Sequence, residues 1–190
     1  SAKEVGLSLG SFGTKKLDAY LGFKSESLRG SVSLMSASSD GYREHSESKQ
    51  NSAQFKLSTS GDWGKVGFVA RGFEENAQLP SYLTPAQFAA TPRRIGANPA
   101  TSDRSGGSVG IRYDRELSDG NAISLDVAHQ SSLEKAYFTI HNNRTTISPE
   151  YRMAVGAGTG VVGAELADAH ANTDNDKQVG QRSQSLYVQT

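Results

Sequence analysis

The stretch from Ser52 to Phe73 constrains the fold more than any other part of this sequence. Apolar residues alternate with polar or small ones on both sides of a polar break at 60–62. A two-residue period indicates a β-strand with one apolar and one polar face, and a short polar break between two such runs is typical of a hairpin turn. The stretch therefore predicts an antiparallel hairpin with Phe55 on its apolar face and Gln54 on its polar face.

Most of the remaining sequence repeats this plan, which predicts ten strands in total. Pro149 lies inside the eighth strand and weakens that prediction, because proline cannot donate a ladder hydrogen bond. The strands are expected near 3–10, 15–25, 28–37, 52–58, 66–73, 109–114, 123–128, 145–155, 159–170 and 184–190.

The connections between the predicted strands alternate in length from the second strand onward. Because alternate connections of an up-and-down sheet lie on the same edge, one edge would carry tight turns and the other the long loops. This asymmetry is typical of an outer-membrane barrel, whose strands need ~9–11 residues to cross the bilayer. Short connections are expected near 26–29, 60–62, 118–121 and 156–158, and long ones near 38–49, 76–105, 136–145 and 171–182.

These features predict an all-β fold, an antiparallel up-and-down transmembrane β-barrel. Only 35% of the residues are hydrophobic, which is low for a soluble core of this size. In lipid every backbone polar group must find a partner within the protein, which favours a closed barrel over an open sheet. A soluble β-sandwich or small soluble barrel is the alternative, since any half-buried antiparallel sheet alternates in the same way.

Other functional classes find little support in the sequence. A net charge of +0 argues against a nucleic-acid partner, and the absence of cysteine excludes a thiol nucleophile. The four histidines lack metal-ligand spacing, and no Ser–His–Asp arrangement points to an enzyme. Residues 158–163 match a dinucleotide fingerprint and 174–176 a calcium loop, but each lacks its surrounding motif. We therefore expect no enzymatic activity, metal or cofactor.

Two segments, GYREHSESKQNSAQFKL and LPSYLTPAQFAATPRR, resemble those of TonB-dependent outer-membrane receptors of the ferric citrate or siderophore type. SFGTKKLDAYLGF, TTISPEYR and QSLYVQT are similar to barrel segments of the same family. The resemblance implies a barrel of about 22 strands filled by a plug. Residues 1–190 would form a single unit, the first ten or so barrel strands, with the plug and the remaining strands absent.

The same resemblance implies a function in the outer membrane of a Gram-negative bacterium. The whole receptor would take up a ferric siderophore or ferric citrate, and the TonB energy-coupling complex would act on it through the missing plug. Outer-membrane lipid would surround the barrel. The alternative is a small, self-contained porin-like or adhesin barrel of about ten strands.

The longest predicted loop contains a helix signal. Thr84 and Gln87 are spaced as a capping box, and Pro85 occupies the first helical position, which predicts a short helix over 85–90. Pro92 would end this helix. Leu83 and Phe88 are the side chains expected to pack it onto a neighbour.

Arginine and tyrosine side chains in the predicted long loops are the candidates for ligand contact. Guanidinium groups suit bidentate binding of carboxylates, and tyrosine adds a hydroxyl group and a stacking surface, which together suit an anionic ferric chelate. These ligand-binding candidates are Tyr42, Arg43, Tyr82, Arg93, Arg94 and Arg104. A second set, Arg71, Arg112 and Asp114, is expected to face the lumen.

Overall fold

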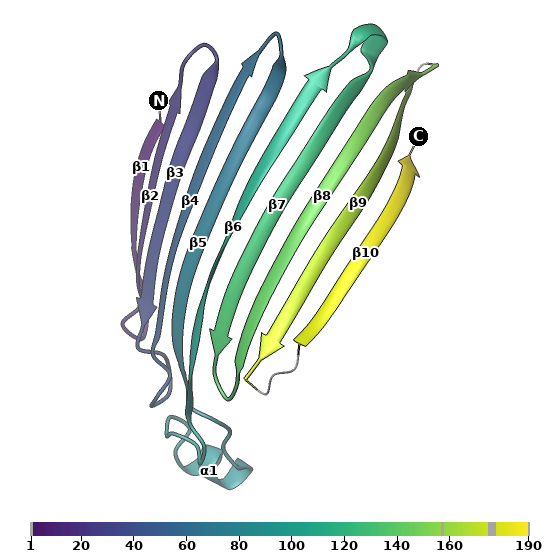
Figure 1. Cartoon of the computed structure of the whole chain (residues 1–190). Helices are drawn as coiled ribbons and strands as arrows, with labels where there is room; N and C mark the ends of the chain where they lie inside the picture. The colour runs from purple at the N-terminus through teal and green to yellow at the C-terminus, as the bar shows by residue number, and fades with distance from the viewer. Residues whose placement is uncertain (1, 157, 175–177, 190) are drawn as a thin grey trace.

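Ten antiparallel strands form one continuous sheet in strict chain order, β1 to β10 (Figure 1). This computed structural model describes residues 2–156, 158–174 and 178–189, with the backbone alone at 119. The all-β, up-and-down prediction is therefore confirmed. The strands are β1 Ala2–Leu9, β2 Lys15–Lys24, β3 Leu28–Ser39, β4 Ser48–Gly61, β5 Gly64–Leu79, β6 Ala100–Glu116, β7 Ala122–Lys135, β8 Thr139–Val155, β9 Gly158–Thr173 and β10 Gln178–Gln189, with the helix α1 Pro85–Ala90 and a 3-10 turn, η1, Ser118–Gly120.

The sheet is a single curved layer without a core of its own. Figure 1 shows β1–β3 nearly edge-on and β7–β9 face-on, with β1 and β10 at opposite ends. The accessible surface is 12959 Å², whereas a compact monomer of this mass exposes roughly 8,800 Å². Among the described residues, only Ala122 and Ala167 are buried apolar side chains. Both faces of the sheet therefore need surroundings other than this chain.

The strand register separates the side chains into two faces, here named the apolar face and the polar face. Phe55 pairs with Val32 on one side and Ala70 on the other, and these three lie on the apolar face. Gln54 pairs with Ser33 and Arg71 on the polar face. The face assignment made from the alternation in β4 and β5 is confirmed, because directly opposed residues of an antiparallel pair share a face.

The apolar face carries a band whose boundary shifts steadily across the sheet. In β2 the last apolar residue before the polar end of the strand is Leu17, which lies in the same register row as Gln178 of β10. In β10 the corresponding boundary residue is Leu186, eight positions further along. A shift of about one residue per strand, or ~3.3 Å along the strand for ~4.8 Å across the sheet, corresponds to a strand tilt of about 35° relative to the band normal.

The complete boundary follows the same course through the strands between these two. Its members are Leu17, Leu34, Ala53, Ala70, Val109, Val127, Ile147, Leu166 and Leu186. The opposite side of the band ends in aromatic residues: Trp63 in the β4–β5 turn, Tyr113 in β6 and Tyr151 in β8. The Tyr113 hydroxyl donates to the Trp63 carbonyl at 2.8 Å. Tilted strands, an apolar band and flanking aromatics are the features of a transmembrane barrel wall.

The loop lengths require a correction. Two connections predicted to be long are short, because β7 extends to Lys135, β8 begins at Thr139, and β9 and β10 leave only 174–177 between them. The longest loop covers 80–99 rather than 76–105, and strands reach 17 residues. The cause is that these strand ends carry polar residues on both faces. Alternation disappears there, but the backbone ladder continues and needs no apolar side chain.

Two connections on one edge of the sheet are long, 40–47 and 80–99. We call this edge the loop edge, and the opposite edge, with tight connections, the turn edge; the helix α1 lies beyond the loop edge (Figure 1). On the turn edge, the β2–β3 and β4–β5 connections and η1 confirm turns predicted there. Residue 157, in the β8–β9 connection, lies outside the described residues. No helix in the described part of the chain has the length and apolarity to cross a membrane.

Pro149 is accommodated inside β8, which runs from Thr139 rather than from the predicted 145. It pairs with Leu125 of β7, while the paired register with β9 passes from Ile147–Leu166 directly to Glu150–Gly163. The strand thus continues past the proline with a local gap in its ladder on the β9 side.

Candidate functional site at the loop edge and on the polar face

The two long loops, 40–47 and 80–99, pack together as one unit, named here the loop pair. The Glu44 backbone N–H donates to the Arg93 carbonyl at 2.7 Å, and the Glu44 carboxylate accepts from the Ile95 N–H at 3.1 Å. Within the longer loop, the Gly96 N–H donates to the Pro80 carbonyl at 2.6 Å and closes its base. These bonds pair backbone groups that an extended loop would leave to water.

Arg43 is the central clamp of the loop pair. Its Nη1 donates to the Ser81 carbonyl at 2.7 Å, and its Nη2 and Nε donate to the Arg94 carbonyl at 2.9 and 3.3 Å. The side chain is half-buried. A planar guanidinium with donors on two sides suits this bridging role, which a lysine could not reproduce. Most of the donors of Arg43 are therefore already engaged within the protein.

An aromatic and cationic stack joins three connections of the loop edge. The Phe12 ring, in the β1–β2 turn, meets the Tyr42 ring edge-on at 5.5 Å between centroids and 87° between planes. The Arg93 guanidinium lies 4.9 Å from the centroid of the same Tyr42 ring. The Asp40 N–H also donates to the Phe12 carbonyl at 2.9 Å. The turn at 10–14 and the two long loops are thus held in a fixed arrangement.

The helix α1 forms where the capping box predicted it, over Pro85–Ala90. The Gln87 N–H donates to Thr84 Oγ1 at 3.3 Å, and the Thr84 N–H donates to Gln87 Oε1 at 3.0 Å. The expectation that Phe88 packs the helix onto a neighbour is wrong, since this side chain is 59% exposed. The helix is stabilised by its caps at Thr84 and Thr91 rather than by packing of an apolar face, and it has no buried residue.

Two residues of the loop pair adopt a left-handed backbone that is uncommon without glycine. His45 has φ 56° and Ser81 has φ 63°. His45 Nε2 lies 2.9 Å from the Ala100 carbonyl, and Ser81 offers its carbonyl to the Arg43 clamp. Such conformations persist only where surrounding contacts over-determine them. Sequence reasoning missed His45, because a histidine in a polar loop carries no pattern that distinguishes it from a solvent-exposed one.

The predicted ligand candidates are divided by the structure into two groups. Tyr42, Arg43, Tyr82, Arg93 and Arg94 all belong to the loop pair. Tyr82 is 72% exposed, and the Arg93 and Arg94 side chains are exposed as well. Contact of these residues with a ligand stays a prediction.

The placement of Arg104 in a loop is wrong. It lies in β6, in the register row of Glu75 and Glu134, and its guanidinium is 3.5 Å from the carboxylate of each. The loop-edge ends of β5, β6 and β7 carry mostly polar residues, so no alternation marks the strand at Arg104. The sequence pattern therefore predicts a loop there. Its two carboxylate partners more than balance its positive charge on the polar face.

The second predicted set lies on the polar face, as the alternation requires. Arg71 sits opposite Gln54 and Ser108, and Arg112 lies opposite Gly67 and Asp126. The Arg112 Nε is 3.0 Å from Asp114 Oδ1. That this face lines a lumen stays a prediction.

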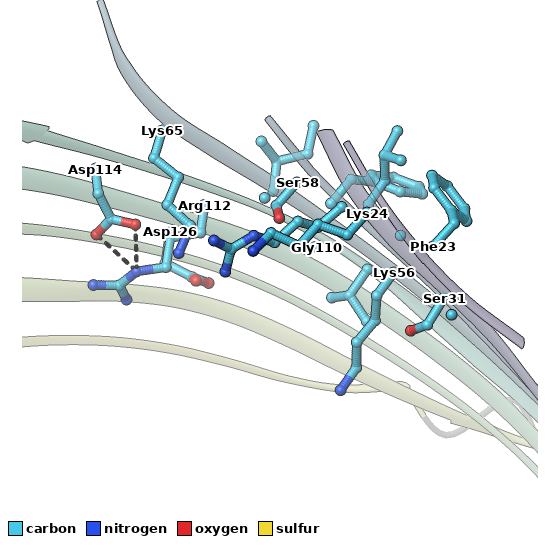
Figure 2. A pocket seen from close by; sticks show the side chains of 18 of the residues that line it. Phe23, Lys24, Ser31, Lys56, Ser58, Lys65, Gly110, Arg112, Asp114 and Asp126 are labelled. Carbon is cyan, nitrogen blue, oxygen red and sulfur yellow. Dashed lines mark hydrogen bonds and ion pairs between the residues drawn. The ribbon is translucent and has the colours of Figure 1, made fainter. Parts of the chain in front are cut away.

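Arg112 and Asp114 line a hollow of about 830 Å³ on the polar face. Figure 2 shows Lys24, Lys56 and Lys65 projecting beside them, from β2, β4 and β5. Sequence reasoning missed these lysines. Each occupies a polar-face position of an alternating strand, but only the register shows that they gather in one place. The hollow also holds Arg29 and Asp126.

The 158–163 glycine pattern lies within β9, and the described residues beyond that strand form β10 rather than a helix, so the dinucleotide interpretation is wrong. Of the weak calcium motif, positions 175 and 176 lie outside the described residues. In the part of the chain that the structure describes, no three His, Asp, Glu or Cys side chains are grouped to hold a metal ion.

The fold is that of part of the barrel of TonB-dependent receptors. The sheet matches the ferric citrate transporter FecA in its unliganded form with a TM-score of 0.72 and 12% identity, over 94% of this chain and 32% of FecA. It matches the pyoverdine outer membrane receptor FpvA of Pseudomonas aeruginosa PAO1 with a TM-score of 0.63 and 10% identity, over 95% of this chain and 31% of that one. FauA, the alcaligin outer membrane receptor of Bordetella pertussis, matches with a TM-score of 0.58 and 11% identity, over 96% and 32%.

The chain spans about a third of the length of these solved structures. No family model matches the sequence, and no curated protein matches it. The three matched proteins are one transporter and two receptors. At this level of identity the likeness establishes the fold.

Proposed function

We propose that this chain is part of the barrel wall of a TonB-dependent receptor that takes up a ferric chelate, a siderophore or ferric citrate, across a Gram-negative outer membrane. The observation that carries the proposal is the match of 94% of the chain to the ferric citrate transporter FecA at a TM-score of 0.72. The tilted apolar band, which fits a bilayer, supports the outer-membrane location.

In this proposal the loop pair is the outer face of the receptor. The exposed Arg93 and Arg94 guanidiniums and the exposed Tyr82 hydroxyl offer donors to an anionic chelate. Tyr42 offers its ring to Arg93, and Arg43 holds the loops that present these groups. The polar face then faces the lumen, and coupling to TonB would pass through a plug that lies outside residues 1–190.

The test is uptake of radioactive iron by Gram-negative cells that lack their own chelate receptors and produce the natural protein carrying this chain. Ferric citrate and a panel of ferric siderophores are supplied one at a time, with and without a working energy-coupling complex. We expect uptake of one class of chelate that requires the coupling complex. Uptake that ignores the coupling complex would support a porin-like pore, and uptake of none would contradict the proposal.

Residue roles are tested in the same cells. Replacing Arg93 and Arg94 together by alanine removes two exposed cations of the loop pair, so the apparent affinity for the chelate is expected to fall. Arg144, on the polar face and 3.5 Å from Glu165, provides the control substitution. An equal effect of Arg144→Ala would contradict the assignment of the ligand site to the loop pair.

A further inference from the structure

A groove on the apolar face crosses the boundary of the apolar band. It consists of a lower hollow of about 670 Å³ at the boundary and an upper hollow of about 360 Å³ toward the loop edge. Most residues that line the two hollows belong to the apolar face by register. The hollows share Asn51, Glu74 and Ser105 and are therefore continuous. We name them together the boundary groove.

The two hollows differ in chemistry. The aliphatic residues of the apolar face that line the lower hollow are Leu17, Ala19, Leu34 and Ala53. The charged residues of the same face that line the upper hollow are Lys49, Glu74, Asp103 and Lys135. A molecule that fills the whole groove therefore needs an apolar end and a charged end.

The lower hollow is a gap in the side-chain layer of the apolar face. Gly72 of β5 lies opposite Ala53 of β4 and one same-face step beyond the boundary residue Ala70. A Cβ atom at Gly72 would lie 3.8 Å from the Gly106 carbonyl oxygen, an ordinary contact, so this position has room for a side chain. Lining atoms beside an unfilled gap lose van der Waals contacts. In a bilayer, an acyl chain of a lipid can fill such a gap.

The upper hollow contains charges of both signs that are not paired with one another. Lys49 of β4 is diagonal to Glu74 of β5, at about 7–8 Å. Lys135 of β7 lies directly opposite Asp103 of β6. In the described part of the chain, none of the four takes part in an ion pair. Two cations and two carboxylates match a ligand that carries both charges better than an anion alone.

The junction of the two hollows adds hydrogen-bonding groups. Ser36 Oγ donates to Asn51 Oδ1 at 2.8 Å, and among the described residues the amide N–H groups of Asn51 have no acceptor. Ser36 and Asn51 lie one same-face step beyond the boundary residues Leu34 and Ala53. Lipid head groups occupy the layer directly beyond the hydrocarbon core, which this first step enters. The polar part of the groove thus begins at the level of a lipid phosphate.

We infer that the boundary groove binds one zwitterionic phospholipid whose head group carries a primary ammonium. One acyl chain fills the lower hollow beside Gly72, the phosphate accepts from Asn51 and Lys49, and the ammonium group donates to Glu74. An anionic phospholipid would satisfy Lys49 but leave Glu74 without a partner. The inference rests on the membrane location in the proposed function and goes beyond it, because it does not depend on the chelate.

The experiment is native mass spectrometry of the natural protein carrying this chain, first stripped of lipid in detergent. The protein is then exposed to vesicles of phosphatidylethanolamine, phosphatidylglycerol or lipid A, one composition at a time. We expect one phosphatidylethanolamine to stay bound at detergent levels that remove the other two lipids. Equal retention of phosphatidylglycerol or lipid A, or retention of no lipid, would overturn the inference.

A filled lower hollow locates this lipid on the chain. Gly72→Leu places a side chain in the gap, and we expect the retained phosphatidylethanolamine to be lost. Ala70→Leu is the matched control, because Ala70 lies on the same strand and face but lines neither hollow. The two variants should therefore differ by one bound lipid. The same number of bound lipids in both variants would contradict binding in the boundary groove.

Substitutions of the charged residues test the head group. Glu74→Gln should lower the affinity for phosphatidylethanolamine by about tenfold, as expected for the loss of one charged hydrogen bond, without lowering that for phosphatidylglycerol. Lys15→Gln is the control, because Lys15 lies on the same face outside both hollows. An equal loss in Lys15→Gln would contradict the inference.

An exchange of the two charges separates their role from damage to the fold. Lys49→Glu combined with Glu74→Lys keeps one charge of each sign, so the preference for phosphatidylethanolamine over phosphatidylglycerol should persist. Loss of this preference in the exchanged variant would contradict recognition of a zwitterion. Iron uptake is not measured in any of these experiments, so failure of the proposed transport function and failure of this inference remain distinguishable.

Discussion

The turn-edge and loop-edge halves of the same strands are stabilised by different kinds of side-chain contact. In the turn-edge half, apolar side chains such as Phe55, Phe68 and Ile111 fill one face and polar side chains the other. In the loop-edge half most side chains on both faces are polar, and contacts between charged and polar groups replace the band, as at Arg104 with Glu75. The difference shows that the backbone ladder sets where a strand runs, while the surrounding medium sets which side chains it carries.

The largest expected effect is a difference in folding free energy between substitutions on the apolar and the polar face of the turn-edge half. Phe55→Lys places a charge in the apolar band, and we expect a loss of roughly 2–4 kcal/mol in folding free energy if the site lies near the bilayer midplane. Gln54→Lys, one residue away on the polar face, is the matched control and should cost far less. Both are measured by reversible denaturant unfolding in lipid bilayers. Equal losses would show that this half does not face lipid.

The next effect tests whether polar contacts hold the loop edge together. Arg43→Ala removes the donors to the Ser81 and Arg94 carbonyls, and we expect the local opening free energy of the loop pair to fall by about 2 kcal/mol. Hydrogen exchange of the Gly96 N–H, which donates to Pro80, reports this opening. Arg43→Lys should recover only part of the protection, because a single ammonium group cannot bridge both carbonyls. Unchanged exchange in Arg43→Ala would mean that the stack of Phe12, Tyr42 and Arg93 suffices.

A smaller effect concerns α1, which no apolar contact buries. Thr84→Ala removes the acceptor for the Gln87 N–H and should cost about 1 kcal/mol of helix stability. Faster hydrogen exchange at the Phe88 N–H, which donates to the Thr84 carbonyl at 2.9 Å, would show the fraying. Thr91→Ala, at the other end of the helix, is the control. If both changes act alike, the capping box contributes nothing specific.

The smallest expected effect locates the boundary between the two halves. Asn51 is on the same face and strand as Phe55, four residues nearer the loop edge. Asn51→Lys is therefore expected to cost only about 0–1 kcal/mol, as charges near the membrane interface do. The same unfolding experiment used for Phe55→Lys measures it. A cost matching that of Phe55→Lys would mean that the apolar band extends further toward the loops than its side chains indicate.

The same contrast explains what the sequence could predict. Strands were located wherever one face is apolar, so the hairpin around Phe55 and all ten strands were predicted. Around His141 and Asn172 most residues on both faces are polar, so the alternation is lost and the pattern predicts loops there. The capping box at Thr84 has a local signature and was predicted to the residue. The clamp of Arg43 joins two loops that are distant in sequence, and the gathering of Lys24, Arg29 and Lys56 depends on the register of three strands. No local sequence pattern reports either arrangement.

The shift of the apolar boundary has a consequence for how such a wall can change in evolution. Because each same-face step is two residues, the boundary advances by about two residues per hairpin rather than evenly with each strand. The hairpin is thus the unit that carries its own share of the tilt. Duplication or deletion of a whole hairpin leaves the neighbouring strands at their proper depth, so a gene encoding this wall can lengthen or shorten its circumference without rewriting the strands already present.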